Sequence, residues 1–208
     1  TSESNMVDLS GINFDLLAEK FRNGLKNIAI DELKAAIDRT LDKMVEVNKV
    51  RIDFREKFQK LIEQYNEGSR NAEDLLRQLL DLVDQLKEEE TRHIKENITE
   101  EELTIFDLIT RPEKDLNQEE KDQVKRVARQ MLNTLHADRL VLDWKKKENA
   151  RSAVKVTILD ALWGMSQYEG LPQSKFSDAE CDSKAETIYE HVFESYSGEG
   201  KSVYARKS

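Results

Sequence analysis

The sequence predicts an all-α protein, an irregular bundle of about seven to eight helices arranged as one body or as two helical sub-domains. Apolar residues recur at helical spacing through most of the chain, and no segment requires a strand. Only 7 Gly and 2 Pro interrupt its 208 residues. Charged residues make up 36% of the chain, a composition that favours helices with exposed polar faces.

Three helices are expected in residues 1–70, which we predict to be an N-terminal helical segment. Each has an apolar stripe, and the stripes are Phe14, Leu17, Phe21 and Leu25; Leu33, Ile37, Leu41 and Met44; and Phe54, Phe58, Leu61, Ile62 and Tyr65. The third stripe ends at Asn66-Glu67-Gly68, a sequence typical of a helix end and a joint.

Residues 71–197 are predicted to form a C-terminal helical domain. Its first helix carries Leu75, Leu79 and Leu86, and we expect it to run to about residue 96. Thr99 begins a second helix, because a Thr with Glu three positions later is a capping box. Pro112 closes that helix.

Further helices are predicted from Asn117 and Ser177, each of which again has a Glu three positions later. Residues 150–165 also read as a helix, with Val154, Thr157 and Ile158 facing inward, although residues 154–158 alternate as a strand would. Residues 139–144 suggest a short extended connector. Residues 198–208 contain two glycines and are predicted to be a mobile tail.

Charge and cysteine content limit the possible setting and partners. The net charge of −9 argues against indiscriminate binding of nucleic acid, but residues 111–160 hold 12 Lys and Arg against 9 Asp and Glu, a net of +3. The lone Cys181 permits no internal disulfide, and no apolar run approaches the roughly 20 residues that span a membrane. We therefore expect a cytoplasmic protein without membrane contact. The absence of an initiator Met is consistent with a piece of a longer protein.

Motifs for catalysis or metal binding are weak. His93, His136 and His191 each stand alone, whereas a metal site needs converging ligands, so we expect helix-end or surface histidines. Cys181 has no evident base beside it. The Gly-Lys-Ser at 200–202 follows a predicted helix rather than a strand, unlike a phosphate-binding loop. We predict no catalytic residue, no metal ligand and no cofactor site.

Basic residues form two ridges at four-residue spacing, which places each trio on one side of a helix. The ridges are Lys121, Lys125 and Arg129, and Lys147, Arg151 and Lys155. They would suit the DNA backbone or an acidic partner surface. The alternative is ordinary pairing with nearby acids on a solvated face.

Trp144 precedes a cationic run that begins at Lys145. A tryptophan is usually a buried anchor, and here the alternative is a cation-flanked contact at an interface. We include both residues with the ridges as candidate contacts for a partner or DNA.

Four segments in this order resemble the helical region that follows the motor domains of type I restriction R subunits. Residues 51–69 resemble its first part, and residues 98–108 are similar to the pattern L-T/S-E-E-E-x-x-x-F/Y-D-x-L. Residues 142–154 are similar to D-W-x-x-[KR]-x-x-x-R-[AS]-x-[VL], and residues 184–196 resemble the closing helix.

The resemblance implies a parent that is an ATP-dependent type I site-specific endonuclease, with a nuclease domain and a translocase that use ATP and Mg. It implies that this chain is the trailing, non-catalytic assembly module, without cofactors of its own. Its expected partners are the modification and specificity subunits of the methyltransferase core. The alternative is a module that contacts double-stranded DNA through the basic ridges.

Overall fold

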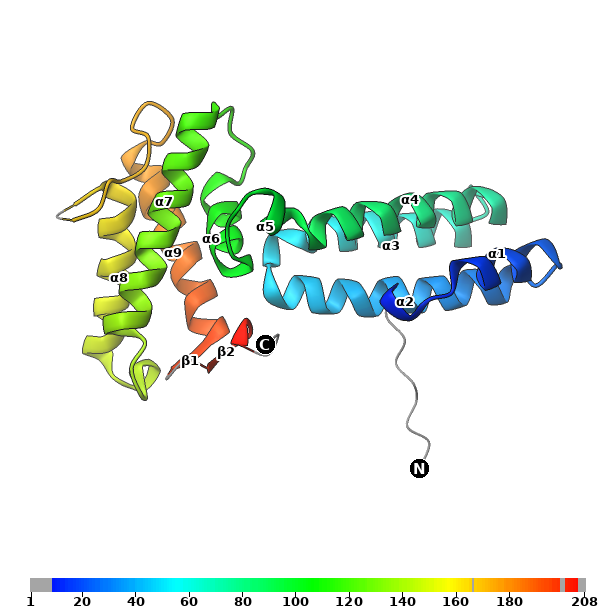
Figure 1. The fold of residues 1–208 in the computed structure, drawn as a ribbon, viewed down its shortest axis with the longest axis horizontal. Coiled ribbons are helices and arrows are strands. Elements are labelled where there is room, and N and C mark those ends of the chain that lie inside the picture. The colour runs from blue at the N-terminus through cyan, green and yellow to red at the C-terminus, as the bar shows by residue number, and fades with distance from the viewer. Residues whose placement is uncertain (1–8, 166, 199–200, 206–208) are drawn as a thin grey trace. The chain divides into compact units, whose positions relative to one another are not determined.

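The computed structural model describes residues 9–165, 167–198 and 201–205. These residues form an all-α fold with one small hairpin, as the apolar periodicity predicted (Figure 1). Eight α-helices are longer than two turns within this described part, and a ninth has only four residues. The chain divides into two compact units, Thr1–Arg92 and His93–Ser208.

Unit 1 is built from the helices predicted for the first stripes and from the long helix that follows them. The predicted apolar stripes make its core, with Leu33, Ile37 and Leu79 fully buried, except that Leu25 of the first stripe is 48% exposed. Helix α4 packs against both α2 and α3, while α1 packs on α2. The elements are η1 (Leu9–Gly11), α1 (Phe14–Arg22), α2 (Lys26–Val47), η2 (Lys49–Arg51), α3 (Ile52–Asn66) and α4 (Ala72–Glu90).

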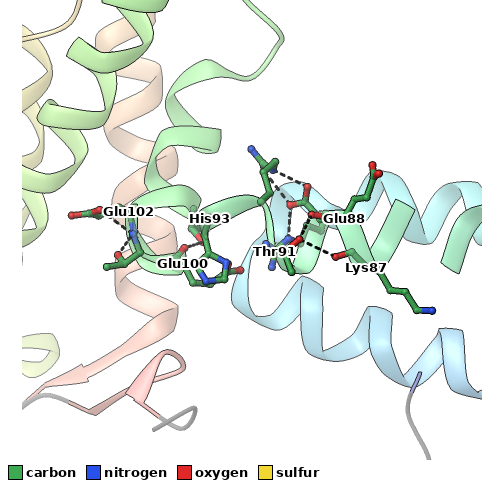
Figure 2. A network of polar contacts seen from close by, with 11 residues as sticks. Lys87, Glu88, Thr91, His93, Glu100 and Glu102 are labelled. Carbon is green, nitrogen blue, oxygen red and sulfur yellow. Dashed lines mark hydrogen bonds and ion pairs between the residues drawn. The ribbon is translucent and has the colours of Figure 1, made fainter. Parts of the chain in front are cut away.

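Helix α4 ends at Glu90, earlier than the expected run to about residue 96. The hydroxyl of Thr91 donates to the carbonyl oxygens of Lys87 and Glu88, which satisfies the last turn (Figure 2). The chain divides into its two units directly after this helix, between Arg92 and His93, whereas the sequence predicts a segment boundary after residue 70. It lies further on because the leucines of α4 are buried against α2 and α3.

Unit 2 contains helices that pack pairwise, α6 on α7, α7 on α8, α8 on α9 and α9 on α6. The predicted capping boxes at Thr99, Asn117 and Ser177 are all present. The elements that follow α5 (Arg92–Lys95) are α6 (Glu100–Thr110), α7 (Gln118–Thr134), the π-turn η3 (Leu135–Arg139), η4 (Trp144–Lys146), α8 (Glu148–Trp163), α9 (Asp178–Ser195), β1 (Tyr196–Gly198) and β2 (Lys201–Ser202).

Two expectations for unit 2 need correction. The stretch 139–144 is not an extended connector, because α7 continues into the π-helix η3 and a short turn then leads into the 3-10 helix η4. The predicted mobile tail also contains structure, since Tyr196 pairs with Ser202 in an antiparallel hairpin. Gly198 permits this hairpin, because a Cβ there would lie 2.9 Å from the carbonyl oxygen of Val141. The favoured helix at 150–165 is confirmed as α8.

None of the helices in the described residues combines the length and the apolar character that crossing a lipid bilayer would demand.

A buried ion pair fastens the end of α4 inside unit 1. Arg51 Nε lies 2.9 Å from Glu89 Oε1, and the two side chains are 3% and 10% exposed. Arg92 Nε lies 2.7 Å from the other Glu89 oxygen. Burial alone would raise the pKa of the Glu89 carboxyl, but the hydrogen bonds from Arg92 and Arg51 hold this pKa below its ordinary value.

Replacing Glu89 should therefore destabilise the chain. We expect Glu89→Gln to lower the free energy of unfolding by about 3–5 kcal/mol, because Arg51 would stay buried without its carboxylate. Since the folded pKa is depressed, this contribution is complete above the unfolded pKa of about 4.3 and is lost as pH falls through the folded value. Urea unfolding at neutral and acidic pH measures both effects. The exposed Glu88→Gln is the control, and an equal loss there would contradict the assignment.

Candidate functional site

The first basic ridge lies on α7, and two of its three members pair with acids of unit 2. Lys125 Nζ lies 2.6 Å from Glu96 Oε2, and its side chain is only 11% exposed. Arg129 donates from Nε and Nη2 to the two carboxylate oxygens of Glu102, at 2.8 and 3.3 Å. Lys121 is exposed. Intramolecular pairing thus accounts for Lys125 and Arg129, which leaves this ridge little unbalanced charge.

A polar hollow of about 640 Å³ lies beside this ridge, between the segment 95–98 and α7. Its cations are Lys95, Lys125, Arg126 and Arg129, and acids that line or pair with them are Glu96, Asp122, Glu102 and Glu169. Arg126, which lies outside both predicted ridges, donates two hydrogen bonds of 2.8 Å to Glu169. Four acids balance four cations, so the hollow has no excess attraction for an anion.

The second ridge lies at the start of α8 and differs in its partners. Arg151 Nη1 donates to the carbonyl oxygen of Lys145 at 2.7 Å, and Lys147 is exposed. Lys155 Nζ lies 3.1 Å from Glu186 Oε1 on α9 and 4.4 Å from the centre of the Tyr189 ring. Within the described part of the chain, only Lys155 of this trio pairs with a carboxylate. This ridge therefore keeps a positive charge.

Trp144 is the buried residue next to this ridge. It is fully buried, and its ring meets Phe193 edge to face with centroids 5.8 Å apart. The buried-anchor prediction is confirmed, and the alternative of an exposed contact through Trp144 is wrong, because the indole is 0% exposed and packs against Phe193 of α9. Lys145 lies above, with Nζ 5.1 Å from the Phe193 centroid, and its partial burial lowers its pKa.

The α8–α9 face is the name we give to the surface formed by Lys145, Lys147, Arg151, Lys155, Tyr189 and Phe193 over Trp144. Phe193 remains 37% exposed, and Leu142, two residues before Trp144 in the connector that leads into η4, is 58% exposed. The face thus combines positive charge with exposed apolar area.

The histidines have roles that the sequence did not reveal. His191, expected at the surface or a helix end, is 1% exposed, and its Nε2 lies 2.8 Å from the Tyr204 hydroxyl. His136 Nε2 lies 2.7 Å from Glu101 Oε1, which also accepts a hydrogen bond from Tyr196. These contacts tie the C-terminal hairpin to α6, α9 and η3 of unit 2. No local signal could have shown them, because Glu101 and Tyr196 are 95 residues apart.

The hydrogen bond between His136 and Glu101 shifts the pKa values of both residues. This hydrogen bond raises the pKa of His136, although burial acts in the opposite direction. Burial alone would raise the pKa of Glu101, but bonds from His136 and Tyr196 lower it overall. Burial raises the pKa of the Tyr196 phenol, which therefore stays a donor.

Other reactive groups are dispersed. His93 Nδ1 lies 3.2 Å from Glu100 Oε2, without hydrogen-bond geometry, so the two form an ion pair only when the imidazole is protonated (Figure 2). Burial raises the pKa of Cys181, which keeps its thiol protonated. Across the described ranges, no three His, Cys, Asp or Glu side chains converge as a metal site would require.

Comparison with known proteins gives the family. Residues 2–190 match the family model described as "Type I restriction enzyme HindI endonuclease subunit-like, C-terminal". The chain belongs to this family. It is accordingly the C-terminal domain of a type I restriction endonuclease R subunit, and the four motif segments indicated this correctly.

A curated relative of this R-subunit domain is the putative type I restriction enzyme MjaIXP endonuclease subunit of Methanocaldococcus jannaschii. The two are 23% identical over 153 residues, which make up 73% of this chain and 14% of the relative. The domain thus spans a small part of that relative's length. No solved structure matches it significantly.

The buried position of Trp144 makes a stability prediction. We expect Trp144→Ala to lower the free energy of unfolding by about 3–5 kcal/mol, because it leaves a cavity under Phe193. Trp144→Phe should cost less, since the indole Nε1 has no hydrogen-bond partner among the described residues. Thermal and urea unfolding measure this. The partly exposed Trp163→Ala is the matched control, and an equal effect there would contradict the anchor role.

The His136–Glu101 pair makes a pH prediction. The pKa of His136 is raised in the folded chain, so its stabilising contribution is complete below the unfolded value of about 6.5 and disappears as pH rises through the folded value. The melting-temperature difference between the wild type and His136→Gln should be larger at pH 6 than at pH 9. In a Glu101→Gln background this dependence should vanish, and its persistence would assign the effect to another group.

Proposed function

We propose that this domain docks its R subunit onto the methyltransferase core formed by modification and specificity subunits. The observation that carries the proposal is the α8–α9 face, where Lys145, Lys147 and Arg151 have no carboxylate partner in the described residues and Lys145 lies over a partly exposed Phe193. Family membership supports it, since this is the C-terminal domain of a subunit of a multisubunit restriction system.

The composition of the face fits protein recognition. Aromatic residues and Arg are enriched in protein interfaces, where they act as anchors surrounded by polar residues. Trp144 fixes Phe193 and Lys145 from below, so these side chains lose little entropy on binding. Positive charge favours an acidic patch on the partner and speeds the encounter. The face would therefore serve as the docking surface, with no reaction of its own.

Nuclease and translocase activities, with ATP and Mg²⁺, would belong to other parts of the parent R subunit under this proposal. The domain corresponds to 14% of the length of its relative, which leaves ample chain for those functions.

DNA contact is the second candidate, and the same unpaired cations favour it. Phosphates would meet Lys147 and Arg151 as readily as carboxylates would. The first ridge is a poorer candidate, because Lys125 and Arg129 would have to leave Glu96 and Glu102. Salt distinguishes the two candidates, since phosphate contacts weaken steeply with rising salt and apolar contacts do not.

The docking proposal predicts the effect of a double variant in the complete R subunit. Lys147→Glu with Leu142→Ser should weaken binding to the purified methyltransferase core about tenfold or more, a loss of at least 1.4 kcal/mol. Both side chains are exposed, so the melting temperature should stay unchanged. Binding can be measured by biolayer interferometry. Lys121→Glu is the matched charge reversal on the first ridge.

Unchanged affinity in the double variant, or an equal loss with Lys121→Glu, would exclude the α8–α9 face as the docking site. The DNA candidate is tested with a labelled duplex at low and high salt. Binding at low salt that is lost in the double variant would support DNA contact, and no binding at low salt would eliminate it.

A further inference from the structure

A groove lies between α2 and α3 in unit 1. The two helices are antiparallel (Figure 1), and α4 packs against both of them. The groove has a volume of about 600 Å³ and is lined by Asp31, Lys34, Ala35, Asp38, Phe58, Gln59, Ile62 and Glu63.

The floor of the groove is apolar. Phe58 is buried at its base, Ile62 is partly exposed, and Ala35 is exposed. Ile28, one turn before Asp31 on the same face of α2, is 50% exposed and prolongs the apolar strip. From Ile28 to Ala35 the strip runs about 10 Å along α2, or about two helical turns.

The rims of the groove are acidic. Three carboxylates, Asp31, Asp38 and Glu63, face one ammonium, Lys34, which gives the lining a net charge of −2. Arg55 binds Asp38 at 3.0 Å but also pairs with Asp42, so it adds no net positive charge to this side of α2. Lys34 lies 3.5 Å from Asp31, and no cation of the described residues pairs with Glu63. Such a groove repels nucleic acid and attracts basic side chains.

We propose that this groove binds an amphipathic helix of another subunit, one whose apolar stripe is flanked by Lys and Arg. A helix laid in a groove places apolar anchors at i, i+4 and i+7, a span of about two turns, and the apolar strip between the acidic rims has that length. The flanking cations would meet Asp31 on one rim and Glu63 on the other. The proposal rests on the assembly role proposed above, but it concerns a surface in unit 1 rather than the α8–α9 face of unit 2.

A basic peptide tests the groove without any methyltransferase. The probe is a labelled helical peptide of about five turns with a Leu stripe flanked by Lys, compared with the same peptide carrying Glu in place of Lys. Fluorescence anisotropy with the full chain should show binding of the basic peptide only. Asp31→Lys with Glu63→Lys should weaken that binding about tenfold or more, or 1.4 kcal/mol.

Glu56→Lys with Glu67→Lys is the matched control, since both residues are exposed and lie outside the groove lining. It should change the affinity less than about twofold, or 0.4 kcal/mol. Failure of the basic peptide to bind, or an equal loss in the control, would overturn the groove proposal while leaving the docking proposal for unit 2 intact. A loss of docking in the Lys147→Glu and Leu142→Ser double variant tests only the docking proposal for unit 2.

Crosslinking identifies the occupant in the complete R subunit bound to the methyltransferase core. A photoreactive benzophenone side chain at position 35 should form its adduct with a basic amphipathic helix of a modification or specificity subunit. An adduct with a second copy of this chain, with the same R subunit, or with DNA would overturn the assignment.

Discussion

Burial of Trp144 beneath the junction of α8 and α9 is the interaction on which the candidate surface of unit 2 depends. The indole packs under Phe193 and sits close to Gly198, whose missing side chain lets the C-terminal hairpin approach Val141. Lys145 follows the tryptophan directly, and its ammonium group lies over the rings of Trp144 and Phe193. The hydrophobic contact therefore fixes where the neighbouring charge of Lys145 lies.

Pairing with acids then decides which cations are available to a partner. Lys125 and Arg129 belong to a ridge as regular as that of Lys147 and Arg151, yet Glu96 and Glu102 neutralise them from neighbouring segments of unit 2. Ion pairs at such partly exposed positions contribute little to stability. Their larger consequence is to remove positive charge from one ridge while the other retains it.

The two units offer surfaces of opposite character. Unit 2 has a cationic face with exposed Phe193, and unit 1 has an apolar groove with acidic rims, led by Asp31 and Glu63. A single acidic or basic partner surface could not satisfy both, because like charges would repel at one of them. Under the two proposals, such a domain would hold two chemically different segments of its partners.

The sequence by itself determined the helices, their buried stripes, the capping boxes at Thr99, Asn117 and Ser177, and the family. These features depend on residues within one or two helical turns of each other, so local spacing contains the information. Only the tertiary structure decided that α4 belongs with unit 1, which ridge keeps its charge, and that Glu101 joins His136 to Tyr196. Those contacts join residues far apart in the chain, and packing geometry alone brings them within reach.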